Sequence, residues 1–245
     1  MSGVLAGRRV LITGGSSGLG AALAAVCAEE GAAVAVIGRD SDRLRGVSEA
    51  TGAFAITGDI GDPGAAGEAV GAAAAELGGI DALVNNAGLM LHSLIGSGLH
   101  EDWEQIMRVN VLGMLHVTNA ALPHLRAAAR SDLLIVASTA ADRVTGADYG
   151  VYAATKAAQA RLTDGLRLEL AEDRQVRISL VKPGFMNTPG LGPGTRNAAL
   201  QQQVVTLKER IGLSPDLVAA EICHLLALPQ EVTIPELTII PTARP

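Results

Sequence analysis

Tyr152 and Lys156 are four positions apart in an alanine-rich stretch that is expected to be helical. On a helix, residues i and i+4 lie on the same face, so this pair would place an ammonium group beside a phenol. A free phenol titrates near pH ~10, and a nearby positive charge lowers that pKa by favouring the phenolate. We therefore expect Tyr152 to be a general acid/base whose pKa is lowered by Lys156. Such pairs are also common on helix surfaces, so the interpretation depends on the rest of the chain.

A second chemical signal is the segment 14–20, Gly-Gly-Ser-Ser-Gly-Leu-Gly, which follows an apolar run at 9–13 and precedes an Ala/Leu-rich helix. Glycines let a backbone turn tightly beside a pyrophosphate, and a helix N-terminus offers free N–H groups to an anion. The spacing, Gly14-x-x-x-Gly18-x-Gly20, differs from G-x-G-x-x-G, and a turn used only for packing is the alternative. The strand before it and the helix after it favour a nucleotide site.

The end of the predicted strand 33–37 bears on which dinucleotide would bind. An NAD site needs a carboxylate at the strand tip for the ribose 2′-hydroxyl, whereas an NADP site needs a cation for the 2′-phosphate. The tip position is Gly38 and Arg39 follows it, while Asp40 and Ser41 are expected to begin the next helix, with Ser41 as the cap. These residues favour NADP(H) over NAD(H). A solvated charge is the alternative interpretation of Arg39.

Strands and helices alternate along the chain. Strands are predicted at 9–13, 33–37, 53–57, 81–85, 133–137, 176–181 and 236–240, and helices at 18–30, 63–77, 101–109, 112–130, 150–173 and 215–228. This alternation predicts an α/β fold with a doubly wound, mostly parallel sheet and helices on both faces. No linker or repeat divides the sequence, so residues 1–245 are expected to form a single domain. Polar residues that end these strands, such as Asp59 (at an adenine or as a helix cap) and Ser138, are candidates for the site.

The composition excludes several classes of protein. Hydrophobic residues make up 49% of the 245 residues and charged residues 18%, with a mean hydropathy of +0.32, which is typical of a globular chain with a large core. A net charge of −6 without a basic cluster argues against a nucleic-acid partner. The five histidines show no metal-ligand spacing, so no metal site is expected, and Cys27 and Cys223 are expected to be buried thiols. No run resembles a membrane span or a signal segment, so a cytoplasmic location without membrane contact is expected.

These motifs, in this order and at these approximate distances, resemble the short-chain dehydrogenase/reductase family over essentially the whole chain. The resemblance rests on Thr13-Gly14-x-x-x-Gly18-x-Gly20, Asn85-Asn86-Ala87-Gly88, Asn110, the hydroxyls near 138, Tyr152-x-x-x-Lys156, Pro183-Gly184 and Thr188. It implies a Rossmann-type fold and an NADP-dependent branch. The segment 236–242 and Asp142-Arg143-Val144 are similar to the branch that contains clavulanic acid dehydrogenase.

The resemblance implies a role for each matching position. Tyr152 would exchange a proton with the substrate oxygen, Lys156 would bind the nicotinamide ribose, and Asn110 would hold a water that connects Lys156 to solvent. The remaining positions would hold the dinucleotide: Gly14, Ser16, Ser17, Gly18, Leu19 and Gly20 at the phosphates, Arg39 at the 2′-phosphate, Asp59 and Ile60 at adenine, Asn86, Ala87 and Gly88 at the ribose, and Pro183 and Gly184 beside Thr188, which would contact the diphosphate or the carboxamide.

One position departs from the family pattern. A serine usually lies thirteen residues before the tyrosine and binds the substrate oxygen, but that position here is Thr139, with Ser138 before it. Adjacent residues on a strand point to opposite faces, so only one of the two hydroxyls would face the substrate. The register favours Thr139, whereas a bulge would present Ser138.

The expected function is hydride transfer between NADP(H) and a carbonyl or secondary alcohol. A dinucleotide-binding sensor or scaffold without catalysis is the alternative, supported only by the serine-to-threonine change. Sugar-nucleotide isomerase or dehydratase chemistry fits poorly, because the chain leaves little room for a substrate domain. Segments 189–211 and 140–148 are expected to select a mostly hydrophobic small molecule. Tyr149, Phe185, Met90 and Leu91 are candidate wall residues, with core packing as the alternative for the last three. The resemblance implies a homo-oligomer joined through the helices at about 112–130 and 150–173, with packing inside one subunit as the alternative for their Ala-rich faces.

Overall fold

The computed structural model describes residues 3–173, 175–189 and 198–242. Within these ranges, seven parallel strands form one sheet in the order β3-β2-β1-β4-β5-β6-β7. The strands are β1 (Arg9–Thr13), β2 (Ala33–Gly38), β3 (Phe54–Thr57), β4 (Ala82–Asn85), β5 (Ser131–Val136), β6 (Val176–Pro183) and β7 (Glu236–Ile239). The predicted doubly wound fold is confirmed. The strand order changes direction between β1 and β4, and ligands of such sheets bind beyond the carboxyl ends of the strands at that point.

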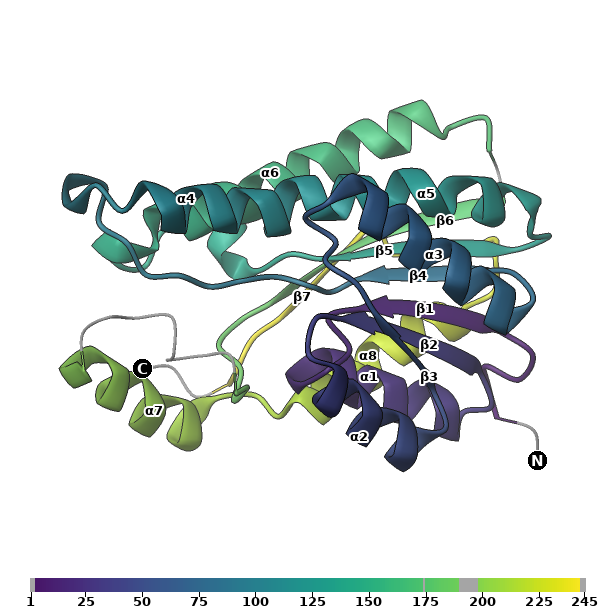
Figure 1. Cartoon of the computed structure of the whole chain (residues 1–245), viewed down its shortest axis with the longest axis horizontal. Coiled ribbons are helices and arrows are strands. Elements are labelled where there is room, and N and C mark those ends of the chain that lie inside the picture. Colours follow the sequence, from purple (N-terminus) through teal and green to yellow (C-terminus); the bar gives the residue numbers. More distant parts are fainter. Residues whose placement is uncertain (1–2, 174, 190–197, 243–245) are drawn as a thin grey trace.

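Helices cover both faces of the sheet (Figure 1). One layer contains α3 (Pro63–Leu77), α5 (Met114–Ala127) and α6 (Gly150–Glu169), and the other contains α1 (Gly18–Glu29), α2 (Ser41–Thr51) and α8 (Pro215–Ala227). Alternate residues of each strand face the two layers: Leu11 packs toward the first, and Val10 and Ile12 pack toward the second. Two cores therefore hold every inner strand. Cys27 and Cys223 are buried free thiols in the second layer, as predicted.

Three local features differ from the predictions. Asp40, not Ser41, caps α2, and its Oδ1 accepts the N–H of Arg43 at 3.0 Å. β5 begins at Ser131, two residues before its predicted start, because α5 ends at Ala127. The helical backbone continues through Asn110: α4 (His100–Met107) passes into a π-helical turn, η2 (Arg108–Gly113), and then into α5.

The segment 198–211 is the helix α7 (Ala198–Ile211), whereas residues 190–197 of the predicted substrate segment lie outside the described residues.

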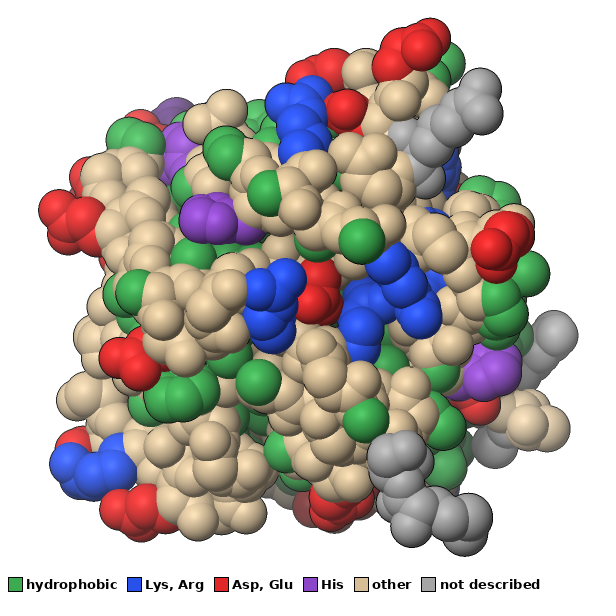
Figure 2. All heavy atoms as spheres, turned by 90° about the vertical axis from the view of Figure 1, so that its right-hand side faces the viewer, with side chains coloured by type: hydrophobic (Ala, Val, Ile, Leu, Met, Phe, Trp, Pro, Cys, Tyr) green, Lys and Arg blue, Asp and Glu red, His purple; other side chains and the backbone are tan. Residues whose placement is uncertain are grey.

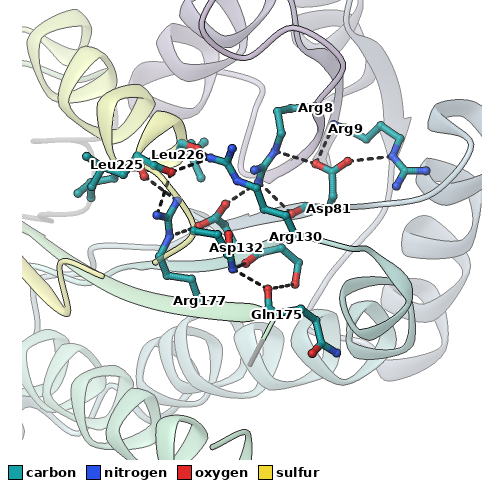
Figure 3. A network of polar contacts seen from close by, with 12 residues as sticks. Arg8, Arg9, Asp81, Arg130, Asp132, Gln175, Arg177, Leu225 and Leu226 are labelled. Carbon is teal, nitrogen blue, oxygen red and sulfur yellow. Dashed lines mark hydrogen bonds and ion pairs between the residues drawn. The ribbon is translucent and has the colours of Figure 1, made fainter. Parts of the chain in front are cut away.

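A buried network of arginine and aspartate side chains joins the strand ends at the amino edge of the sheet, and Figure 2 shows basic side chains beside an acidic one in a hollow of that face. Asp132 lies between Arg177 Nε at 2.6 Å and Arg8 Nη2 at 2.5 Å (Figure 3). Arg8 Nε also lies 3.0 Å from Asp81 Oδ1. The Arg177 guanidinium donates to the carbonyl O of Leu225 near the end of α8, at 2.9 Å. These contacts fix the starts of β1, β4, β5 and β6 to one another and to α8.

Candidate active site

The glycine-rich turn lies at the carboxyl edge, between β1 and α1. Gly14 has φ +69°, a conformation that L side chains rarely adopt, and a Cβ there would lie 2.8 Å from Ala87 Cα. A Cβ at Gly20 would collide with the carbonyl O of Gly14. The turn therefore needs glycine at both positions. It leaves the backbone bare at the start of α1, where a pyrophosphate could approach it.

The N-terminus of α1 is open to an anion. Ser17, its N-cap residue, makes no side-chain cap hydrogen bond, so the first N–H groups of the helix have no acceptor from that side chain. Thr188 lies beside the turn, because a Cβ on Gly18 would be 3.4 Å from Thr188 Cβ. The side chain of Leu19 is buried in the core, so only its backbone could meet a phosphate.

Asn86 ties the end of β4 to the end of β1. Its Nδ2 donates to the carbonyl O of Thr13 at 2.9 Å and approaches that of Gly14 at 3.4 Å. The backbone N–H groups of Asn86 and Ala87 donate to Thr13 Oγ1 at 3.1 and 3.0 Å. The Asn86 amide therefore shapes the glycine turn, whereas the resemblance assigns this residue to a ribose.

Of the residues expected around the adenosine part of a bound dinucleotide, some lie on the surface and some in the core. Arg39 is exposed directly after β2, next to the turn, where a Cβ on Gly38 would lie 3.4 Å from Ser16 Oγ. Asp59 Oδ1 accepts the N–H of Gly61 at 2.9 Å, and the cap of α3 is Asp62, so the expectation that Asp59 could cap that helix is wrong. Ile60 is only 7% exposed, so its backbone alone could meet an adenine.

Pro183 ends β6 and Gly184 follows it. Pro183 is buried, and the N–H of Gly184 donates to the carbonyl O of Ile239 at 2.7 Å. These two residues connect β6 to β7 and direct the chain toward Thr188.

Ser138, Tyr152 and Lys156 come together at the end of β5. Lys156 Nζ lies 5.9 Å from the centre of the Tyr152 ring and donates to the carbonyl O of Val136, the last residue of β5, at 3.1 Å. Hydrogen bonding by the Ser138 side chain lowers the pKa of Tyr152, although burial outweighs this effect. Gly88 borders the same place, because a Cβ there would lie 3.4 Å from Lys156 Nζ. A phenol, a hydroxyl and an ammonium group thus lie near one another at the carboxyl end of β5, the strand next to β4.

Burial controls the pKa values of this group. Part of Tyr152 remains accessible to solvent, but its surroundings are those of the protein interior, and burial raises its pKa to about 12 against the opposing effect of the Ser138 hydrogen bond. Burial also lowers the pKa of Lys156 to about 8. The predicted lowering of the Tyr152 pKa is therefore wrong, because the loss of hydration outweighs the effect of Ser138.

Ser138 is the hydroxyl whose hydrogen bonding lowers the Tyr152 pKa. Ser138 follows β5 as the N-cap of η3 (Thr139–Ala141), and its Oγ accepts the N–H of Ala140 at 3.1 Å. It lies fourteen positions before Tyr152, and Thr139 lies thirteen positions before it. Ser138 is the hydroxyl that acts on the Tyr152 pKa, and Thr139 as the substrate contact stays a prediction.

Asn110 is completely buried and is held by direct contacts. Its Nδ2 donates to the carbonyl O of Leu89 at 2.9 Å and to Thr155 Oγ1 at 3.0 Å, and its Oδ1 accepts the N–H of Leu89 at 2.7 Å. Its own carbonyl O accepts Gln159 Nε2 at 2.8 Å, and Gln159 Oε1 accepts Lys156 Nζ at 3.0 Å. Where the resemblance implies a water, a glutamine amide connects Lys156 to Asn110. The sequence interpretation missed Gln159, although its spacing of three from Lys156 on a helix was a usable signal.

A histidine and an aspartate were also missed. His92 Nδ1 lies 2.9 Å from Asp148 Oδ2, and the His92 ring packs edge-on against Tyr149 with centres 4.5 Å apart. Tyr149 in turn lies 6.5 Å from Tyr152, between ring centres. Nothing in the spacing of His92 indicated this pairing.

The described residues contain no helix that is long and apolar enough to cross a membrane. In the same part of the chain, no three His, Cys, Asp or Glu side chains are grouped as metal ligands would be.

Comparisons with known proteins agree with this fold. The family model for short chain dehydrogenases matches residues 8–198. An uncharacterized oxidoreductase of Staphylococcus saprophyticus is 34% identical over 238 residues, which cover 94% of this chain and 96% of the relative. A short chain dehydrogenase from Burkholderia cenocepacia in complex with NADP superposes with a TM-score of 0.80 at 32% identity, over 96% of this chain and 97% of that one. An alcohol dehydrogenase from the archaeon Thermococcus sibiricus, complexed with 5-hydroxy-NADP, gives a TM-score of 0.82 at 27% identity, over 97% of this chain and 99% of that one. The chain belongs to the short-chain dehydrogenase/reductase family of oxidoreductases.

Proposed function

We propose that the protein transfers a hydride between NADP(H) and a carbonyl compound or secondary alcohol, with Tyr152 as the general acid/base. The observation that supports this most strongly is the meeting of Ser138, Tyr152 and Lys156 at the carboxyl edge of the sheet. Each type of group has a task there: a phenol to move a proton, a hydroxyl to bind the substrate oxygen, and an ammonium group to bind ribose hydroxyls.

The protonation states favour carbonyl reduction. With a pKa of about 12, Tyr152 is protonated at neutral pH and is ready to donate its proton to a developing alkoxide. Alcohol oxidation needs the phenolate, which is scarce until the pH approaches that value. We therefore assign Tyr152 as the proton donor and expect oxidation to become faster as the pH rises.

The nucleotide is proposed to be NADP(H), which supplies or accepts the hydride when bound. The bare turn at Gly14 and Gly20 and the open N-terminus of α1 fit a pyrophosphate. Arg39 is exposed beside this turn and is proposed to pair with the 2′-phosphate. Complexes of NADP and of 5-hydroxy-NADP are described for the Burkholderia and Thermococcus relatives, which supports the same preference here.

The substrate is proposed to be a small, mostly apolar carbonyl compound selected by the segments around 140–148 and 189–211. Tyr149 and the half-buried Met90, Leu91 and Phe185 are the proposed wall residues. The alternative of a catalytically inactive nucleotide sensor is supported only by the threonine at position 139, and the influence of Ser138 on the Tyr152 pKa favours the enzyme.

Replacement of Tyr152 by Phe tests the proposed function. We expect Tyr152→Phe to lose at least ~100-fold in kcat over a panel of ketones and aldehydes, because a general acid contributes about that much. NADPH affinity, measured by fluorescence titration, should be preserved. Tyr149→Phe is the matched control, three positions earlier, and should alter KM more than kcat. Undiminished turnover by Tyr152→Phe would refute the assignment.

Assembly into a homo-oligomer through α5 and α6 is also proposed. Leu168 on α6 is 81% exposed and Leu112, just before α5, is 47% exposed, as expected of residues that a second copy would cover. Light scattering would give the mass in solution.

A further inference from the structure

Gln159 is almost completely buried, with 1% of its surface exposed, one helical turn after Lys156 on α6. A buried primary amide is costly unless its donor and acceptor ends are both hydrogen-bonded. Both ends are used here, and both partners belong to the candidate site. Oε1 accepts Lys156 Nζ at 3.0 Å, and Nε2 donates to the carbonyl O of Asn110 at 2.8 Å.

Asn110, whose carbonyl O accepts from Gln159, is held in place by residues from other parts of the chain. Asn110 lies in the π-helical turn η2, a feature that is often found at functional sites. Its side chain is bound to Leu89, after β4, and to Thr155 on α6. The Gln159 amide therefore attaches a mobile side chain, that of Lys156, to a rigid backbone carbonyl.

We propose that Gln159 is a positioning residue of the active site, which holds the Lys156 ammonium in a fixed place relative to Tyr152 by connecting it to the Asn110 carbonyl. This inference rests on the function proposed above. It assigns to an amide of this chain the connection that a water would otherwise make.

An amide and a water in that place differ chemically. A water both gives and receives protons, whereas Oε1 of a primary amide only accepts a hydrogen bond and Nε2 only donates one. Gln159 therefore holds Lys156 as a donor and adds no charge. Tyr152, also on α6, is the titratable group that faces Lys156. The neighbouring groups from β5 and η2 are uncharged: the carbonyl O of Val136 accepts from Lys156, and that of Asn110 accepts from Gln159. Burial lowers the lysine pKa.

Direct titration of Lys156 tests the proposal without any substrate. The chain has three lysines, Lys156, Lys182 and Lys208. Protein labelled with ¹³C at lysine Cε thus gives three signals, which Lys182→Arg and Lys208→Arg assign. We expect Lys156 to titrate near pH 8 in the unaltered protein.

Two variants of similar length should move that titration in opposite directions. Gln159→Met removes the acceptor and should lower the midpoint by roughly one pH unit, whereas Gln159→Glu adds a negative charge and should raise it by about one unit or more. Both should lower kcat, and Gln159→Glu should shift the alkaline limb of the kcat profile upward with the lysine. Thr163→Val is the control for general loosening of the helix. Thr163 lies one turn further along α6, and in the described contacts its buried hydroxyl donates only to the carbonyl O of Gln159, at 2.7 Å.

The outcomes separate this inference from the proposed function. Equal midpoints in both variants, or shifts in the same direction, would overturn the role of Gln159 whatever the enzyme does. Opposite shifts in a protein that reduces no carbonyl compound would leave the Gln159 contact intact and overturn the proposed function alone.

Discussion

Replacement of Lys156 by Met should change how the stability of the protein depends on pH. Lys156 keeps 4% of its surface exposed, and burial lowers its pKa from 10.5 to about 8. One pKa unit corresponds to ~1.4 kcal/mol, so the protonated lysine weakens the folded state by about 3 kcal/mol compared with a hydrated one. The unfolded chain keeps the proton up to a higher pH than the folded one. The free energy of unfolding therefore rises with pH through the window from about 8 to 10.5.

Lys156→Met lacks this titration, although it also loses the hydrogen bonds to Val136 and Gln159. The free energy lost with these hydrogen bonds is nearly the same at every pH. The informative quantity is therefore the free energy of unfolding of the variant minus that of the unaltered protein. We expect this difference to fall by about 3 kcal/mol between neutral pH and pH ~10.5. Tyr152, whose raised pKa destabilises the fold above pH 10, is present in both proteins and cancels.

Urea denaturation at several pH values, followed by circular dichroism, measures the difference. Lys182→Met is the matched control, because Lys182 is equally buried but lies against Asp142 and Glu236, which raise its pKa despite the opposing effect of burial. Its contribution to stability is present below pH 10.5 and is lost only above that value. The difference for Lys182→Met should thus stay constant over the same window. A constant difference for Lys156→Met as well would refute the burial argument.

Three further outcomes are expected. Ser138→Ala should lower kcat by about 100-fold, as loss of one oxyanion donor does, whereas Thr139→Ala should cost far less; steady-state kinetics on one ketone compare them. Arg39→Ser should raise the Kd for NADPH by about 10- to 100-fold, because a charge-assisted contact is lost, and should leave the Kd for NADH nearly unchanged. Fluorescence titration measures both constants, and equal effects on both nucleotides would contradict the assignment. Asp132→Asn should lower the free energy of unfolding by about 3–5 kcal/mol, because two buried guanidinium groups lose their carboxylate; thermal melting checks this.

The layered fold could be predicted because its determinants are local. Apolar runs such as Val10-Leu11-Ile12 are buried on both faces, and glycine marks the turn that follows β1. The first residues of the helices were less predictable, since they depend on which side chain accepts a hydrogen bond from a free backbone N–H. Asp40 and Ser41 are both good N-cap residues, and only the fold decided that Asp40 caps α2.

The candidate site was predictable where spacing along one helix decides the geometry, and not where burial or loop length decides it. Tyr152 and Lys156 share a face as expected, but the direction of the Tyr152 pKa shift depends on how deeply α6 packs, which no spacing reveals. The choice between Ser138 and Thr139 could not be made by counting back from the tyrosine, because the count crosses an irregular segment, whereas the place of Ser138 depends on the end of β5. Gln159 was missed because a glutamine on a helix is usually solvated.

The arginine–aspartate network has a consequence for how such a chain acquires new specificity. It binds the strand starts together without help from the segments that follow the strands. Insertions or exchanges at 140–148 would therefore leave the register of the sheet intact. Evolutionary change of substrate is expected to concentrate at that rim, and libraries for directed evolution should randomise it while the opposite rim is left untouched.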